Sequence, residues 1–162
     1  YWSKYKKYYY SGDYAKKDND NYIWLLGRAD DVLKVAGHRI GTAELESCIV
    51  SDNDVAESAV CGIPDDIKGE VIIAYVVLKN GITTNKNILE KNLYYKIRND
   101  VGAIATPKEI YFVSKLPKTR SGKIMRRLLK SIATGETIGD TTTLDDVSAV
   151  TEIQQVVKEK TK

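Results

Sequence analysis

The chain has 162 residues, of which 43% are hydrophobic and 29% charged, and its formal net charge at pH 7 is +3. This length allows one domain with a real hydrophobic core, and no apolar run approaches the roughly 18 residues of a membrane-spanning helix. These values exclude a membrane-embedded protein and a surface that is basic overall, so we expect no membrane partner and no general nucleic-acid partner.

The start of the chain lacks the features of a secretory signal. Residues 1–10 have neither an apolar core nor a small-residue cleavage site. We therefore expect a piece of a longer protein, cytoplasmic in location, whose targeting information, if any, lies upstream. Cys48 and Cys61 have no His or Cys at metal-ligand spacing, which predicts buried free thiols in a reducing compartment.

Two β-hairpins are predicted first. Residues 8–26 form a ribbon, because aromatic and aliphatic stretches flank the turn-rich residues 18–21. Short strands at 32–35 and 38–40 then surround Gly37, which suits a chain reversal.

A helix and two strands follow. Thr42 is expected to cap the helix, and apolar residues at helical spacing come after it: Leu45, Cys48 and Ile49. Strands are predicted at 55–63 and 70–79. The second is apolar throughout 71–78, which predicts a central strand covered on both faces.

The second half predicts two more helices and a strand. Asn85 opens one helix, with apolar residues at four-residue steps: Leu89, Leu93, Ile97 and Val101. A strand at 109–113 precedes a helix capped by Ser121. Its core-facing residues are Ile124, Met125, Leu128, Leu129 and Ile132, and those expected to face away from the core are Arg126, Arg127 and Lys130.

The remaining residues predict a flexible connector at 134–144 and a short amphipathic helix within 145–160 that docks elsewhere. Strands and helices alternate irregularly with hairpins. The predicted fold class is therefore α+β, a small sheet with helices packed on it, preceded by a β-ribbon that belongs to a different domain.

Three polar motifs carry the functional signal. Asp13 follows Gly12 directly after a predicted strand. Its carboxylate there would either accept hydrogen bonds from the hydroxyls of a ribose or bond to the backbone of its own turn. Residues 27–40 combine arginines, carboxylates and glycines. This combination is typical either of a binding site for a planar anion such as phosphate or of a solvated hairpin with surface ion pairs. A cluster of cations at an expected helix start favours a negatively charged ligand over a mobile basic loop: Lys118, Arg120 and Lys123.

In this order and spacing, the motifs resemble the closing signatures of the superfamily of acyl- and aryl-CoA synthetases, adenylation domains and luciferases. The resemblance runs from about Tyr8 to Asp146. Residues 104–107, 121–127 and 139–141 resemble the acetyl-CoA synthetase branch in particular. It implies the end of an amino-terminal adenylation domain at 1–29, a mobile carboxy-terminal domain at 30–134 and a flexible tail at 135–162.

The resemblance also implies a role for individual residues. Lys123 matches the catalytic lysine of adenylation, and Asp30 matches the hinge of the mobile domain. The residues that match ATP or AMP contacts are Asp13, Arg28 and Arg39, and those that match CoA contacts are Ala36, Gly37 and Arg98. A magnesium ion would be held by carbonyls of Val50 and Val55 and by the side chain of Asp52, which stands where relatives usually have histidine.

The implied function is that of an acetate–CoA ligase, which activates acetate with ATP to acetyl-AMP and passes the acetyl group to CoA. The chain would be inactive alone, and its partner would be the missing amino-terminal domain. ATP, CoA and Mg²⁺ would serve the full-length enzyme. Two alternatives remain: another short-chain ligase, such as a propionyl-CoA synthetase, and a basic nucleic-acid-binding module using Lys118 to Lys130. That stretch lacks the stacking aromatics of RNA-binding domains.

Overall fold

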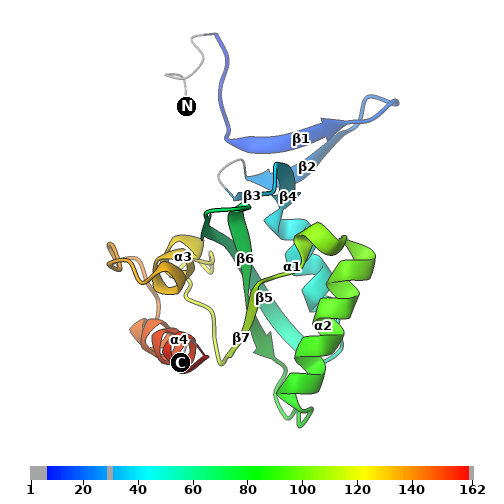
Figure 1. Ribbon diagram of the computed structural model, residues 1–162. Helices are drawn as coiled ribbons and strands as arrows, with labels where there is room; N and C mark the ends of the chain where they lie inside the picture. Colours follow the sequence, from blue (N-terminus) through cyan, green and yellow to red (C-terminus); the bar gives the residue numbers. More distant parts are fainter. Residues whose placement is uncertain (1–6, 29–30, 161–162) are drawn as a thin grey trace.

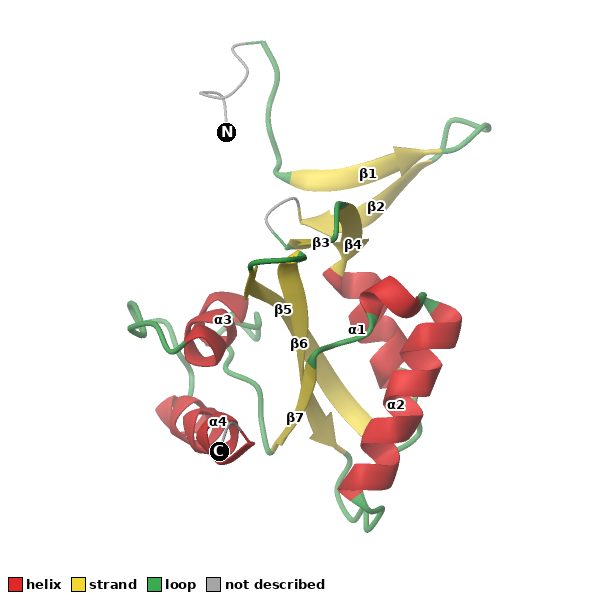
Figure 2. Cartoon of the chain, in the orientation of Figure 1, coloured by secondary structure: helices red, strands yellow, loops and turns green. Residues whose placement is uncertain are grey.

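The structure is a computed structural model that describes residues 7–28 and 31–160. A sheet with helices on both faces forms the body, and a two-stranded ribbon stands beyond one end of that sheet (Figures 1 and 2). No helix among the described residues is long and apolar enough to cross a membrane.

The predicted ribbon is present, with β1 (Asp13–Lys17) antiparallel to β2 (Ile23–Arg28). Its first strand begins at Asp13 rather than at Tyr8, because Gly12 has φ +80° and interrupts the extended backbone. Asp18 closes the turn by accepting hydrogen bonds from the Trp24 indole at 2.8 Å and from two amides. These bonds, the Trp24 bond first, lower the pKa of Asp18.

The second hairpin is also confirmed, as β3 (Val32–Val35) and β4 (His38–Gly41). Both residues of its turn have positive φ, +47° at Ala36 and +82° at Gly37, as a tight hairpin turn requires. Helix α1 (Thr42–Val50) follows, with Gly41 at its N-cap and no capping side chain. The expected cap at Thr42 is wrong, because Thr42 is already helical and buried.

The sheet is organised around β6 (Gly69–Leu78), which pairs antiparallel with β5 (Val55–Asp65) along its length. On its other side, β6 pairs with β3 at Gly69 and then in parallel with β7 (Glu109–Val113). Residues 71–76 are buried without interruption. The prediction of a central strand covered on both faces is therefore confirmed.

Helices cover both faces of this sheet, with α1 and α2 (Lys86–Asp100) on one and α3 (Arg126–Thr134) and α4 (Val147–Lys160) on the other (Figure 2). A short 3₁₀ turn, η1 (Ala103–Ala105), links α2 to β7. Asn85 caps α2 as predicted, accepting from the Asn87 amide at 2.9 Å. The cap predicted at Ser121 is wrong, because α3 begins at Arg126 without a capping side chain.

Successive residues of β6 supply two separate cores. Ile72, Ala74 and Val76 join the core beneath α1 and α2, whereas Ile73 and Tyr75 join the core beneath α3 and α4. The Tyr75 hydroxyl donates to the Leu129 carbonyl at 3.0 Å, and burial raises the pKa of this phenol. The arrangement confirms the α+β class with helices packed on a small sheet.

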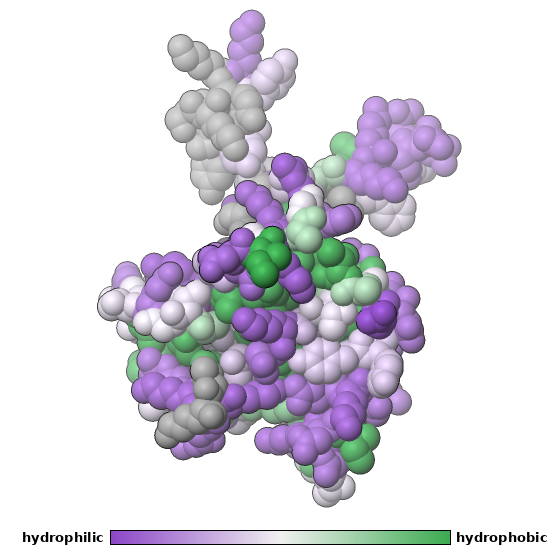
Figure 3. Space-filling view, viewed as in Figure 1, coloured by the Kyte–Doolittle hydropathy of each residue, from purple (hydrophilic) through white to green (hydrophobic). Residues whose placement is uncertain are grey.

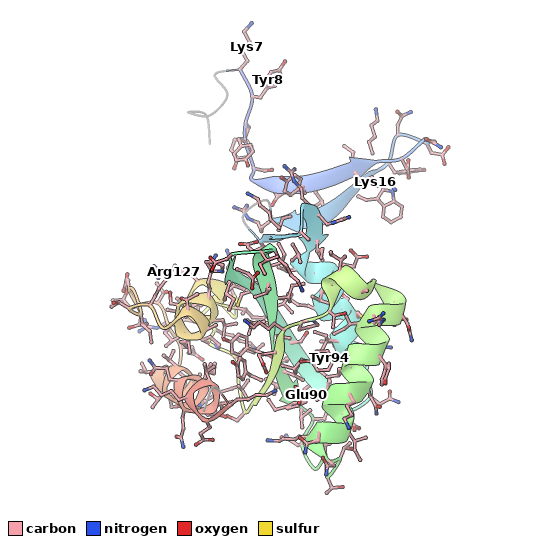
Figure 4. The ribbon with its side chains drawn as sticks, viewed as in Figure 1. Lys7, Tyr8, Lys16, Glu90, Tyr94 and Arg127 are labelled. Atoms are coloured by element: carbon pink, nitrogen blue, oxygen red, sulfur yellow. The ribbon has the colours of Figure 1, made fainter. Side chains whose placement is uncertain are left out.

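Helix α4 is the amphipathic helix expected within 145–160, but it packs on this sheet rather than docking elsewhere, because its apolar face completes the second core. Its buried residues, Ala149, Val150, Ile153 and Val157, pack into the second core. Lys160, at its end, bonds to Glu90 of α2 and to Glu109 of β7, and Glu90 and Tyr94 project from α2 in that direction (Figure 4). The boundaries expected at 29/30 and 134/135 stay a prediction.

Candidate functional site

Lys123 lies on a small hairpin between β7 and α3. The Thr119 amide donates to the Lys123 carbonyl at 2.8 Å, and the Lys123 amide donates to the Thr119 hydroxyl at 3.1 Å. Lys118 and Ile124 form a bridge below this turn, and Gly122 takes φ +81° within it. The Lys123 side chain is exposed and makes no ion pair with any described residue, so its ammonium is available to a ligand.

Several of the neighbouring cations, unlike Lys123 and Arg120, have carboxylate partners among the described residues. Lys118 lies 2.7 Å from a Glu57 carboxylate oxygen, and Lys130 lies 3.8 Å from Glu70. Arg127 donates to the Asp140 backbone carbonyl at 2.9 Å and lies just above α3 in Figure 4. The carboxylates of Glu57 and Glu70 offset part of the positive charge of residues 118–130, which weakens the case for a nucleic-acid surface there.

Arg126 was expected to face away from the core, and this is wrong. Its guanidinium donates to both carboxylate oxygens of Glu46, at 3.0 and 2.7 Å, and lies 3.3 Å from Asp31. Its side chain is only 23% exposed. Burial lowers the pKa of Arg126, the Glu46 and Asp31 carboxylates raise it, and the net shift is upward. The pattern of α3 could not reveal a partner on α1.

Two of the residues expected at the nucleotide come together in the ribbon. Asp13 and Arg28 are directly opposite each other in β1 and β2, and their side chains form an ion pair of 3.3 Å. Arg28 also donates to the Ser11 carbonyl at 2.8 Å. Gly12 has φ +80°, a conformation that favours glycine, and a Cβ there would lie 3.0 Å from the end of the flexible Arg28 side chain.

Arg39, the third of these residues, reaches the ribbon from β4. It donates to the Tyr14 hydroxyl at 3.0 Å, and its guanidinium lies 5.8 Å from the centre of the Tyr14 ring. Because Tyr14 adjoins Asp13, the contact places Arg39 beside the segment that carries the Asp13–Arg28 pair.

The residues expected at the hinge and at CoA are only partly brought together. Asp30 lies outside the described residues. Ala36 and Gly37 are exposed at the β3–β4 turn, where nothing lies within 4 Å of a Cβ built at Gly37. Arg98 is exposed on α2, a different element, so the structure does not join it to that turn.

The predicted magnesium ligands, Val50, Asp52 and Val55, lie where α1 ends and β5 begins. Asp52 accepts the Asp54 amide at 3.0 Å with one carboxylate oxygen, and the Val55 amide donates to the Asp52 carbonyl at 3.2 Å. Val50 is in the last turn of α1, where helix carbonyls lack intrahelical partners. The available oxygens fit magnesium in kind. No group of three or more His, Cys, Asp or Glu residues in the described part of the chain has metal-site geometry.

The two cysteines are free, as predicted, but they are not equally buried. Cys61 is 5% exposed, and burial raises the pKa of its thiol to about 12. Cys48 is half-buried, and burial together with Asp100 raises its pKa. His38 is exposed and bonds only to the Ala36 carbonyl among the described residues, which suits a turn rather than a catalytic pair.

Sequence comparison finds close relatives over nearly the whole chain. The acetyl-CoA synthetase of Pyrobaculum aerophilum is 58% identical over 159 residues, covering 98% of this chain and 24% of the relative. The 3-hydroxypropionyl-CoA synthetase of Metallosphaera sedula is 50% identical, with the same two coverages. The chain thus spans about a quarter of the length of the curated relatives that it matches.

Solved structures agree with this relationship. The Brucella canis acyl-CoA synthetase is 38% identical with a TM-score of 0.59, covering 75% of this chain and 22% of that protein. The anthranilate CoA ligase AuaEII, in complex with anthranoyl-AMP, is 36% identical with a TM-score of 0.67, covering 75% and 23%. The profile of the family described as "AMP-binding enzyme C-terminal domain" matches residues 44–123. Residues 44–123 of this chain therefore match the sequence pattern of an AMP-binding enzyme C-terminal domain.

Proposed function

We propose that this chain is the carboxy-terminal part of an acetate–CoA ligase that forms acetyl-AMP from acetate and ATP and then acetyl-CoA. The observation that carries the proposal is the exposed Lys123 ammonium, presented by a short hairpin and left without an ion pair by the described residues. The 58% identity to an acetyl-CoA synthetase supports the choice of acid.

In the first half-reaction, an acetate oxygen bonds to the α-phosphorus of ATP, and pyrophosphate leaves. Both reactants are anions, so they repel each other as they meet. The Lys123 ammonium would offset that repulsion and stabilise the charge that develops during transfer. Its exposure allows it to enter a site formed largely by the missing domain.

The ribbon would hold the nucleotide. Asp13 would accept the two ribose hydroxyls, and Arg28 and Arg39 would lie near the same nucleotide. The 3.3 Å pair of Asp13 with Arg28 supports this, because it orients the carboxylate before the ribose arrives.

In the second half-reaction, the CoA thiol attacks the acetyl carbonyl carbon, and AMP leaves. The Ala36–Gly37 turn would border the pantetheine arm, and the open space beside Gly37 supports this placement. Arg98 would contact CoA through phosphate. Rotation of the carboxy-terminal domain about Asp30 would remove the Lys123 hairpin from the active site and bring the Ala36–Gly37 turn into its place.

Magnesium and location remain part of the proposal. Val50, Asp52 and Val55 would hold the ion through oxygens, and it would supply a fixed positive charge there. We also expect the longer protein to act in the cytoplasm.

The decisive experiment uses a chimera, the Pyrobaculum aerophilum acetyl-CoA synthetase with this chain in place of the segment that it matches. Lys123→Ala should slow acetyl-AMP formation by about 10²- to 10³-fold, because one preorganised charge is lost. Thioester formation from supplied acetyl-AMP should continue. Pyrophosphate release measures the first step, and consumption of the CoA thiol with supplied acetyl-AMP measures the second.

A matched control is Lys91→Ala, which removes another exposed lysine that makes no ion pair in the described structure. This variant should keep both half-reactions. Equal loss of the two half-reactions in Lys123→Ala would contradict the role given to Lys123. The isolated chain should release no acetate-dependent pyrophosphate, because it carries only part of an active site.

A second candidate is a ligase for 3-hydroxypropionate or another short acid. The 50% identity to the Metallosphaera sedula enzyme favours it. The acyl pocket would belong to the missing domain, so the choice needs the longer protein that contains this chain. Its kcat/KM with acetate, propionate and 3-hydroxypropionate ranks the candidates, and a preference other than acetate would refute the acetate assignment.

A further inference from the structure

Residues 143–145, named the brace from here on, run beside the hairpin that carries Lys123. The Arg120 amide donates to the Thr143 carbonyl at 3.3 Å, and the Asp145 amide donates to the Lys118 carbonyl at 2.9 Å. Between these bonds, Thr119 and Leu144 form an antiparallel bridge. The outgoing arm of the hairpin is therefore paired on both sides, with Ile124 on one and with the brace on the other.

The brace is itself fixed to the body. Leu144 is 5% exposed and belongs to the core beneath α3 and α4. Just after the brace, Asp146 pairs with Lys115, and Glu152 of α4 accepts from the Ser114 amide at 2.8 Å. Movement of the brace would uncover Leu144, which is now buried. The brace therefore links the Lys123 hairpin to a buried core.

A bare hairpin would be a poor support for a catalytic charge, because an isolated two-stranded hairpin is marginally stable in water. The tip of this one, residues 120–123, is exposed. A third paired segment restricts how far the tip can tilt. Reactions that depend on placement lose rate steeply when a group shifts by about 1 Å.

We infer that the brace holds the hairpin in the orientation that adenylation requires, with Leu144 as a positioning residue for Lys123. The inference rests on the proposed function. The brace lies beyond residues 44–123, which the family profile matches. The segment expected to be a flexible tail would then take part in the first half-reaction without touching a substrate.

The test compares two core truncations in the chimera. Leu144→Ala and Ile153→Ala each remove a buried apolar side chain from the same core, but only Leu144 is in the brace. Leu144→Ala should lower kcat for acetyl-AMP formation roughly 10- to 100-fold, while Ile153→Ala keeps it. KM for ATP should not change, and Leu144→Met, which conserves volume, should restore the rate.

Two further readouts separate positioning from a general loss of structure. Thioester formation from supplied acetyl-AMP should be equal in both variants, because that step does not use the Lys123 hairpin. In the isolated chain, amide hydrogen exchange should speed up at Arg120 and Asp145 in Leu144→Ala but not in Ile153→Ala.

Equal adenylation rates in the two truncations would overturn the inference. If Leu144→Ala exchanges rapidly throughout β5 and β6, Asp145→Pro replaces it, since proline removes the amide that bonds to Lys118 and leaves the core side chains in place. Unchanged adenylation in Asp145→Pro then overturns the inference. An inactive parent chimera instead counts against the proposed function, while the exchange experiment still decides whether the brace supports the hairpin.

Discussion

At the scale of single residues, ion pairing divides the cations around Lys123 into two groups. Lys118, Arg126 and Lys130 have carboxylate partners, whereas Lys123 and Arg120 are exposed and have none among the described residues. The sequence predicted a cluster of cations around Lys123, and the cluster is present. It could not assign partners, because Glu57 and Glu46 lie far from the cluster along the chain.

The two cysteines should differ in reactivity. Only the thiolate attacks a disulfide reagent, and burial both covers Cys61 and raises its pKa to about 12. At pH 8, Ellman's reagent should label Cys48 in the native chain and both thiols after denaturation. Native Cys48→Ser should remain unlabelled. Rapid labelling of that variant would show that Cys61 is accessible.

The same thiol should affect alkaline stability. An unfolded cysteine ionises near pH 8.5, but Cys61 in the fold does so only at about pH 12. Its contribution to the free energy of unfolding is therefore complete below about pH 8.5 and is lost as the pH rises towards 12. Urea unfolding at pH 8 and pH 10 should show a smaller decline in Cys61→Ala than in the parent chain.

At the scale of elements, local patterns predicted where strands and helices lie but were less reliable for their ends. The apolar run at 71–78 identified the central strand, and Asn85 identified the start of α2. Thr42 and Ser121 have the right chemistry for caps, yet neither caps a helix. Residues after Ser121 instead complete a hairpin that pairs with residues 143–145, a long-range contact without a local signal.

This difference predicts unequal effects of two similar substitutions. Asn85→Ala should lower the free energy of unfolding by about 1 kcal/mol, because the Asn87 amide loses its acceptor. Ser121→Ala should change it by less than about 0.5 kcal/mol, since its exposed hydroxyl bonds only to Thr119 in the described structure. Urea denaturation measures both. A larger effect at Ser121 would contradict the position of α3.

At the scale of the whole molecule, the sequence predicted the fold class but not the side on which each helix packs. Apolar stripes on α2 and α4 predict burial, and either face of an apolar strand can receive them. Asp13 and Arg28, both singled out from the sequence, lie together in the ribbon, but their roles at a nucleotide stay a prediction. The contact of Arg39 with Tyr14, which joins β4 to the ribbon, had no local signal in the sequence.

Because both cores share β6, we expect the body and α4 to unfold together. Leu93→Ala beneath α2 and Ile153→Ala in α4 remove fully buried side chains from opposite faces. Each should lower the free energy of unfolding by about 2–5 kcal/mol. Calorimetry should show one shifted transition in each variant. A separate early transition in Ile153→Ala would support an independent tail instead.

The alternation along β6 also makes this strand intolerant of changes in length. Inserting one residue before Ile72 would turn every later side chain to the opposite face. The Tyr75 phenol would then enter the layer lined by Leu89, Leu93 and Ile97, away from the Leu129 carbonyl that now accepts its hydrogen bond. A single extra codon in this strand should therefore abolish folding, whereas an extra residue in the exposed turn before Gly69 should be accommodated.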